Sequence, residues 1–87
     1  MLEFYLCASD GCVGCQALVQ TASLVAQRYE FKLSYISDVE EVACLAKRYE
    51  LVKLPALLLM VDGVFQGAVY GYQPYEILAY WVEGYLK

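Results

Sequence analysis

Two apolar runs that flank the dipeptide Asp62-Gly63 limit what this chain can fold into more than any other feature. Residues Ala56 to Val61 form a continuous apolar run, and Val64 to Tyr70 form a second run directly after the dipeptide. An Asp-Gly pair between two such runs is typical of the tight turn of a β-hairpin. We therefore expect two neighbouring strands that pair antiparallel.

The part of the chain before this hairpin predicts two more strands and a helix between them. Leu2 to Cys7 carries apolar residues at both odd and even positions, which indicates a central strand covered on both faces. Ala17 to Tyr29 has apolar residues at steps of four and three, as expected for a helix that packs one face on a sheet. In Phe31 to Tyr35, apolar and polar residues alternate, which predicts a half-exposed strand.

Two more helices are expected, one on each side of the hairpin. Ser37 or Asp38 is a suitable N-cap for the first, with Glu40 or Glu41 placed to complete a capping box. Its predicted buried stripe consists of Val42, Leu45, Ala46 and Tyr49. Pro74 suits the first turn of the last helix. Its predicted apolar face consists of Ile77, Leu78, Trp81, Val82 and Tyr85.

The order of these elements is β-α-β-α-β-β-α. Two right-handed crossovers followed by a hairpin give an α/β fold, in which three helices flank a four-stranded mixed sheet. A chain of 87 residues is too short for a second core, so we expect residues 1–87 to form a single domain.

Composition excludes several classes of function. The net charge is -4 and the chain has only six Lys and Arg residues, with no basic run, so nucleic-acid binding is not expected. The longest apolar run is far shorter than the roughly 20 residues that span a bilayer, and no signal peptide is recognisable at the N-terminus. We therefore expect a soluble, cytoplasmic protein with no membrane partner. The chain has no histidine, which excludes Cys-His catalysis.

The motif Cys12-Val13-Gly14-Cys15 lies between the first predicted strand and the first predicted helix. A thiol at a helix start is close to unpaired backbone N–H groups and the positive end of the helix dipole, which favours its thiolate form. We therefore predict that Cys12 is the nucleophile. Cys15 lies one helical turn further and is predicted to resolve a mixed disulfide formed at Cys12. The two cysteines are the predicted catalytic residues.

This motif, together with the region around Pro55, resembles the thioredoxin superfamily. The run from Lys47 to Leu59 is similar to the thioredoxin stretch that contains the cis-proline, and Pro55, Gly63 and Gly71 follow one another at intervals of eight residues, as in thioredoxins. Since the extra N-terminal strand and helix of thioredoxins have no counterpart here, the chain resembles a minimal thioredoxin-like or glutaredoxin-like domain.

The resemblance implies a substrate site around the two cysteines. It implies that the Leu54-Pro55 bond is cis and that the backbone at Leu54 pairs with an extended substrate segment. The implied substrate-binding residues are Gly11, Val13, Gly14, Leu54, Pro55, Gly71 and Tyr72. The implied activity is that of a thiol-disulfide oxidoreductase that reduces protein disulfides and receives electrons from an unidentified reductase. The resemblance implies no bound cofactor and no metal.

Two alternatives remain open at this stage. Cys7, Cys12, Cys15 and Cys44 follow approximately the spacing of the ligands in plant-type [2Fe–2S] ferredoxins, so an iron–sulfur or other metal site is one alternative. A redox-inactive thioredoxin-like binding module is the other, because Gly11 replaces the tryptophan that precedes the first cysteine in thioredoxins.

Expectations also follow for single residues outside the motif. Cys7 is predicted to be a buried strand residue and Cys44 an exposed one. Tyr70, Tyr72 and Tyr75 surround Gly71, where they could form one aromatic docking surface or take part in ordinary packing. Among the residues expected in the core or at its edge are Tyr35 and Trp81.

Overall fold

The computed structural model describes residues 2–8 and 15–86 of the chain. Its elements follow the predicted order β-α-β-α-β-β-α, which confirms the predicted fold class. The helices and strands are β1 (Leu2–Cys7), α1 (Cys15–Arg28), β2 (Lys32–Ile36), α2 (Val39–Tyr49), β3 (Ala56–Val61), β4 (Val64–Tyr70) and α3 (Tyr75–Leu86).

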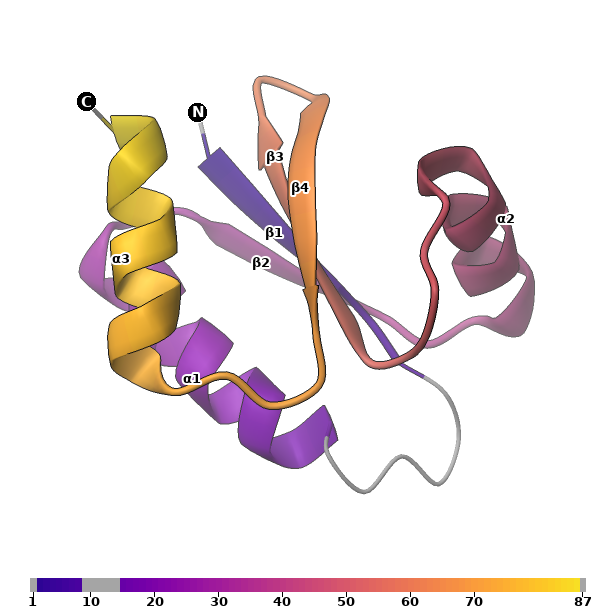
Figure 1. Ribbon diagram of the computed structural model, residues 1–87, viewed down its shortest axis with the longest axis horizontal. Helices are drawn as coiled ribbons and strands as arrows, with labels where there is room; N and C mark the ends of the chain where they lie inside the picture. Colours follow the sequence, from indigo (N-terminus) through magenta and orange to yellow (C-terminus); the bar gives the residue numbers. More distant parts are fainter. Residues whose placement is uncertain (1, 9–14, 87) are drawn as a thin grey trace.

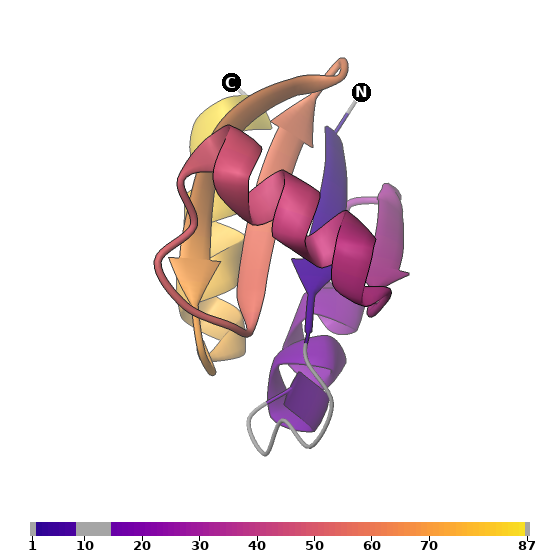
Figure 2. The ribbon, with the colours of Figure 1, turned by 90° about the vertical axis from the view of Figure 1, so that its right-hand side faces the viewer.

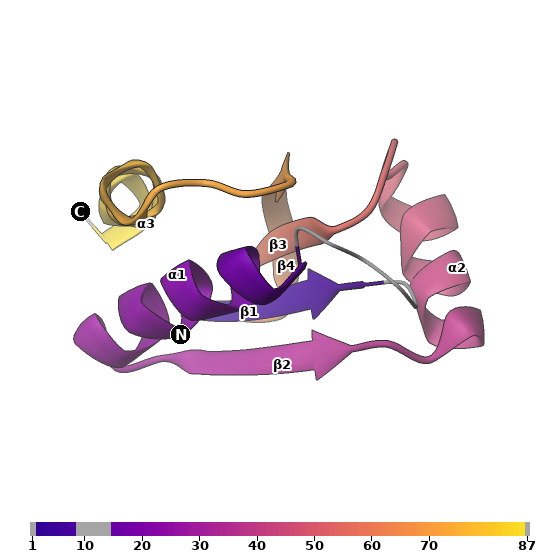
Figure 3. The same ribbon diagram turned by 90° about the horizontal axis from the view of Figure 1, so that it is seen from below.

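The four strands form one mixed sheet in the order β2-β1-β3-β4. β1 pairs parallel with β2 and antiparallel with β3, so the first strand is central, as predicted. Figure 3 shows the arrows of β1 and β2 pointing the same way. β3 and β4 form the predicted hairpin, whose turn residues Asp62 and Gly63 have φ angles of 51° and 81°. Positive φ at both positions is required by the type of tight turn that matches strand twist.

The helices lie on both faces of this sheet. α1 and α3 lie side by side on one face, and α2 crosses the other face alone (Figures 1 and 2). The Asp38 carboxylate accepts a hydrogen bond of 3.1 Å from the Glu41 N–H, which identifies Asp38 as the N-cap of α2. In the part of the chain that the structure describes, no helix combines the length and apolar character needed to cross a membrane.

The first hydrophobic cluster lies between the sheet and the helices α1 and α3. Phe4 is at its centre, with the ring of Phe31 edge-on at 4.8 Å and the ring of Trp81 stacked at 6.2 Å. Its fully buried large side chains are Phe4, Leu6, Leu18, Val25, Leu57, Leu59, Leu78 and Val82. Trp81 packs against this cluster as a partly buried residue, so its place at the core is confirmed.

The second cluster lies between the sheet and α2 and is smaller. Its buried members are Cys7, Val42, Ala56, Leu58 and Met60. Of the predicted stripe on α2, only Val42 is buried, whereas Leu45, Ala46 and Tyr49 are partly exposed. One helix cannot cover a face of four strands, which explains why the rest of the stripe stays accessible to solvent.

Predictions of burial were wrong at three residues. Tyr35 is 54% exposed because it lies on β2, which is an edge strand of the sheet that the described residues form. Ile77 and Tyr85 are on the side of α3 that turns away from α1, and both are exposed. Pro74 lies at the start of α3, one residue before its first helical residue, and its carbonyl accepts a hydrogen bond of 3.1 Å from the N–H of Leu78.

Candidate functional site

One end of the sheet brings several of the predicted site residues together. The strand register aligns Ile36, Cys7, Ala56 and Tyr70 in one row across all four strands. The chain continues from this row to Ala8 on β1, and it enters β3 from Pro55. Ala8 therefore leads from the central strand towards the segment that contains the two cysteines of the motif.

Backbone hydrogen bonds fix the residues just beyond this row. The N–H of Ala8 donates to the carbonyl of Ile36 at 3.0 Å, and the N–H of Gly71 donates to the carbonyl of Pro55 at 2.9 Å. Pro55 is buried and its bond to Leu54 is cis. Gly71 has a φ of 71°, which a residue with a side chain adopts only with strain. The structure thus places Pro55 and Gly71, two of the predicted substrate-binding residues, side by side.

The second cysteine of the motif is held at the start of the first helix. Cys15 is the first residue of α1, is 4% exposed and belongs to the first hydrophobic cluster. It is disulfide-bonded. The predicted site residues Gly11, Cys12, Val13 and Gly14 lie outside the described residues. The predicted position of Cys15 at a helix start agrees with the structure.

The other two cysteines differ from Cys15 and from each other. Cys7 and Cys44 are free thiols, the first fully buried in β1 and the second exposed on α2, as the sequence predicted. Burial raises the pKa of the Cys7 thiol, because a thiolate would lose its hydration there. Cys7 lies in the cluster on the α2 face, whereas Cys15 belongs to the cluster on the opposite face.

This distribution bears on the iron–sulfur alternative. Four-ligand clusters need their cysteines gathered around one site. Within residues 2–8 and 15–86, no three cysteine or acidic residues are close enough together to hold a metal ion, so Cys7, Cys15 and Cys44 do not form such a group. The cysteine spacing alone grouped Cys7 with Cys15, which belong to clusters on opposite faces of the sheet.

An apolar pocket of about 390 Å³ lies beside Leu54, where the α2 face meets the end of the sheet. Ala8 and Leu54 line it on the sheet side, and the first two turns of α2 line it on the other. The α2 residues that line it are Val39, Val42, Ala43 and Ala46. Val42 and Ala46 also belong to the predicted buried stripe, whereas Val39 and Ala43 were not predicted, although the i, i+3, i+4, i+7 spacing of the four residues was a readable signal.

The three tyrosines around Gly71 do not form one surface. Tyr70 packs against the second cluster and Tyr75 against the first, on opposite faces of the sheet. Tyr75 also accepts a hydrogen bond of 2.9 Å from the Arg28 guanidinium. Only Tyr72 is exposed to a large extent, at 54%. The predicted aromatic docking surface is therefore absent, and of the three tyrosines only Tyr72 is exposed enough to contact a partner.

Comparisons with known proteins agree with this geometry. The chain is 33% identical over 69 residues to thioredoxin from Staphylococcus aureus, a match that covers 78% of this chain and 66% of the relative. This chain thus spans slightly less than two thirds of the curated relatives that it matches. No protein-family model matches it.

Solved structures show the same architecture. A mutant thioredoxin from Halobacterium salinarum NRC-1 superposes with a TM-score of 0.83 at 27% identity, covering 99% of this chain and 75% of that one. A structure described as thioredoxin-2 of the malaria parasite protein secretion machinery superposes with a TM-score of 0.78 at 13% identity, covering 97% and 82%. Fold, relatives and sequence pattern agree, and the chain belongs to the thioredoxin superfamily.

Proposed function

We propose that this protein is a thiol-disulfide oxidoreductase that reduces disulfides of other proteins through Cys12 and Cys15. The observation that carries the proposal is the disulfide-bonded, buried Cys15 at the first residue of α1. Its helix is joined to β1 at the sheet end where Pro55 and Gly71 meet. Kinship with thioredoxins supports the same activity.

The proposed cycle moves two electrons from the protein to its substrate. The Cys12 thiolate attacks one sulfur of the substrate disulfide, forms a mixed disulfide, and releases the other substrate sulfur as a thiolate that takes up a proton. The Cys15 thiolate then attacks the Cys12 sulfur and releases the second substrate thiol. This leaves a Cys12–Cys15 disulfide, which an unidentified reductase returns to the dithiol.

The position of Cys15 suits the resolving role. A thiol that is 4% exposed is inaccessible to large disulfide substrates, whereas an adjacent mixed disulfide within the motif can reach it. The first turn of α1 offers backbone N–H groups with no helical partner, which stabilise negative charge on a nearby sulfur. We expect Cys12 to meet the substrate first for this reason.

The pocket beside Leu54 suggests how a protein substrate is held. An extended segment that pairs with the backbone at Leu54 would direct one of its side chains towards Ala8, Val42 and Ala46, which are apolar. Val39 is 75% exposed at the rim and can contact such a segment without any change in the fold. We therefore propose protein disulfides flanked by an apolar residue as the substrate class.

Trapping of mixed disulfides tests this function directly. In a Cys44→Ser background, which removes the exposed thiol, the Cys15→Ser variant should accumulate mixed disulfides with a disulfide-bonded model protein such as insulin. The matched Cys12→Ser variant should accumulate none, because its remaining motif thiol is buried. Trapping by neither variant, or equally by both, would contradict the proposed roles.

A redox titration of the protein separates this function from an inactive binding module. Thiol alkylation followed by mass spectrometry should show a two-electron transition of Cys12 and Cys15, with a midpoint in the range of roughly -270 to -120 mV that the family spans. A reversible transition without turnover of any protein disulfide would instead favour the binding module.

The substitution Val39→Glu should slow the reduction of insulin more than that of a small disulfide such as cystine.

A further inference from the structure

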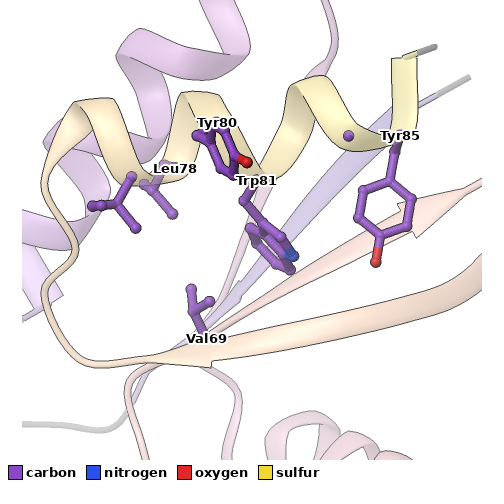
Figure 4. Close-up of a pocket in the computed structure, with 7 residues that line it drawn as sticks. Val69, Leu78, Tyr80, Trp81 and Tyr85 are labelled. Carbon is purple, nitrogen blue, oxygen red and sulfur yellow. The ribbon is translucent and has the colours of Figure 1, made fainter.

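The two edges of the sheet differ in how open they are to a further strand. The edge strand β4 has a bulge opposite Leu59 and Met60. The Trp81 ring also lies against β4, 3.7 Å from where a Cβ atom at Gly67 would be. Figure 4 shows this ring and Tyr85 reaching from α3 towards the strand. Such features protect an edge strand from pairing. β2, the other edge strand, pairs with β1 in one unbroken register.

The outer edge of β2 carries backbone groups that are spaced to pair with an extended segment. The carbonyl of Ile36 accepts the N–H of Ala8, so the backbone groups of Ile36 point towards β1. Because successive residues of a strand direct these groups to opposite sides, those of Leu33 and Tyr35 point away from β1. No strand formed by residues 2–8 and 15–86 lies on that side. The N–H and C=O groups of both residues are therefore available to an added strand.

Both faces of the sheet are incompletely covered beside this edge. Tyr35 shares a face with Leu33, which packs against the first hydrophobic cluster, yet Tyr35 itself is 54% exposed. On the opposite face, a pocket of about 410 Å³ lies between β2 and α2. Its lining residues are Tyr5, Ser34, Ile36, Glu41, Cys44 and Leu45. An added strand would thus meet an aromatic ring on one face and this pocket on the other.

The chemistry of the pocket suits a long basic side chain. Tyr5, Ile36 and Leu45, which pack against the second cluster, form its apolar walls. Glu41 adds a carboxylate from the first turn of α2. Lysine and arginine lay their aliphatic stems along apolar surface and keep their charged ends accessible to water or to a carboxylate. A basic residue of an added strand can therefore lie along Ile36 and Leu45 with its charge near Glu41.

The charge around β2 favours a basic partner as well. Lys32 is the only basic residue in the sequence from 30 to 41, and it lies level with Glu3 on β1, at the end of β2 remote from Ile36. The same twelve positions hold four acidic residues, Glu30, Asp38, Glu40 and Glu41. A basic extended segment is attracted to this edge, whereas an acidic segment is repelled.

A second copy of the chain lacks this complementary charge. When two β2 strands pair antiparallel over their whole length, Ser34 lies opposite Ser34 and Leu33 opposite Tyr35. The same register brings Glu30 of each copy near Asp38 of the other, so like charges meet at both ends of the pair. The edge therefore favours a different, basic chain.

From these observations we infer that the free edge of β2 binds an extended, basic segment of another protein. The segment adds a fifth strand to the sheet and places a lysine or arginine side chain in the pocket beside Glu41. This pocket shares no lining residue with the pocket beside Leu54. The inference does not depend on the proposed redox activity, because neither cysteine of the motif takes part.

Amide hydrogen exchange tests the added strand residue by residue. The probe is a peptide of about six residues in which valine and lysine alternate, with acetyl and amide ends, at up to about 1 mM. We expect it to slow the exchange of the Leu33 and Tyr35 N–H groups about tenfold or more. The N–H groups of Ser34 and Ile36 should change less, because they point towards β1. No protection at Leu33 and Tyr35, or equal protection by a peptide of alternating valine and glutamate, would overturn the inference.

Two substitutions of Tyr35 isolate the contribution of the backbone. Tyr35→Pro removes the outward N–H and leaves the hydrogen bonds to β1 in place, since proline is tolerated on edge strands. Tyr35→Ala is the matched control, because it removes the same ring but keeps the N–H. Fluorescence anisotropy of the labelled peptide should give a dissociation constant about tenfold higher for Tyr35→Pro than for Tyr35→Ala. Equal affinity of the two variants, with both folded by circular dichroism, would show that no strand is added.

A charge reversal in the pocket tests the basic character of the partner. Glu41→Lys should raise the dissociation constant of the peptide about tenfold or more, because like charges then meet in the pocket. Glu76→Lys makes the same change of net charge on α3 and should alter the constant by no more than about twofold, since salt screens distant charges. A similar loss of affinity in both variants would contradict the proposed place of the basic side chain.

Discussion

The two faces of the sheet differ in how completely they are covered. On the face that carries α1 and α3, fourteen of the described residues are buried in one cluster, whereas the α2 face buries five. Cys15 belongs to the first face, and the pocket beside Leu54 opens on the second. The well-covered face thus holds Cys15 in place, and the thinly covered face leaves an open apolar pocket, where we propose that the substrate binds.

The largest effect is expected at the centre of the well-covered face. Phe4→Ala should lower the free energy of unfolding by about 3 to 5 kcal/mol, because it removes a fully buried ring that contacts Phe31 and Trp81. Urea unfolding followed by circular dichroism measures this loss. Leu24→Ala is a matched control on the exposed side of α1 and should change stability by no more than about 0.5 kcal/mol.

A smaller effect is expected on the thinly covered face. Val42→Ala should cost about 2 kcal/mol, because it removes two methyl groups from the only buried residue of α2. The same urea titration provides the measurement. If this cost equalled that of Phe4→Ala, the two faces would contribute equally to stability and the comparison would fail.

The N-cap of α2 should contribute less to the stability of the protein than Val42 does. Asp38→Ala removes the acceptor for the Glu41 N–H and should lower stability by about 1 kcal/mol. Asp38→Asn is the matched control, because asparagine is an equally good N-cap without the charge. Chemical unfolding of both variants distinguishes the hydrogen bond from simple electrostatics. An equal loss in both would mean that the negative charge, and not the cap, stabilises the helix.

The sequence predicted local features of the fold better than the exposure of individual residues. Local patterns were sufficient for the order of elements, the central position of β1 and the hairpin turn at Asp62-Gly63, and they narrowed the N-cap of α2 to Ser37 or Asp38, because each depends on neighbouring residues. Exposure was harder to predict. Tyr35 and Ile77 fit apolar patterns but are exposed, since no element within residues 2–8 and 15–86 packs over the outer edge of β2 or the outer side of α3.

In the candidate site, too, only the local features could be predicted from the sequence. The position of Cys15 at a helix start could be predicted from the placement of the motif between a strand and a helix. The pocket beside Leu54 could not, because it combines Ala8 and α2 residues more than thirty positions apart in the sequence. The separation of Cys7 from Cys15, which spacing alone had grouped together, also required the strand arrangement.

The smallest expected effect is a pH dependence of stability that arises from Cys7 on the thinly covered face. Burial raises the pKa of the Cys7 thiol above its ordinary value of 9.0, so the folded protein holds this proton at pH values where the unfolded chain has begun to lose it. Stability from this group is therefore complete below the unfolded pKa and is lost as the pH rises through the folded one. Cys15, on the well-covered face, is disulfide-bonded and contributes no such dependence.

Unfolding titrations at a series of alkaline pH values measure this effect. Cys7→Ala should lower stability at neutral pH, because a buried side chain is truncated, and should also flatten the decline that begins near pH 9. Tyr5→Phe serves as the control on the same face. Burial and the neighbouring Glu3 raise the pKa of Tyr5 above 10.0, so its contribution has the same sign but falls at higher pH. A decline near pH 9 that is unchanged in Cys7→Ala would show that the thinly covered face admits enough water to hydrate the Cys7 thiolate.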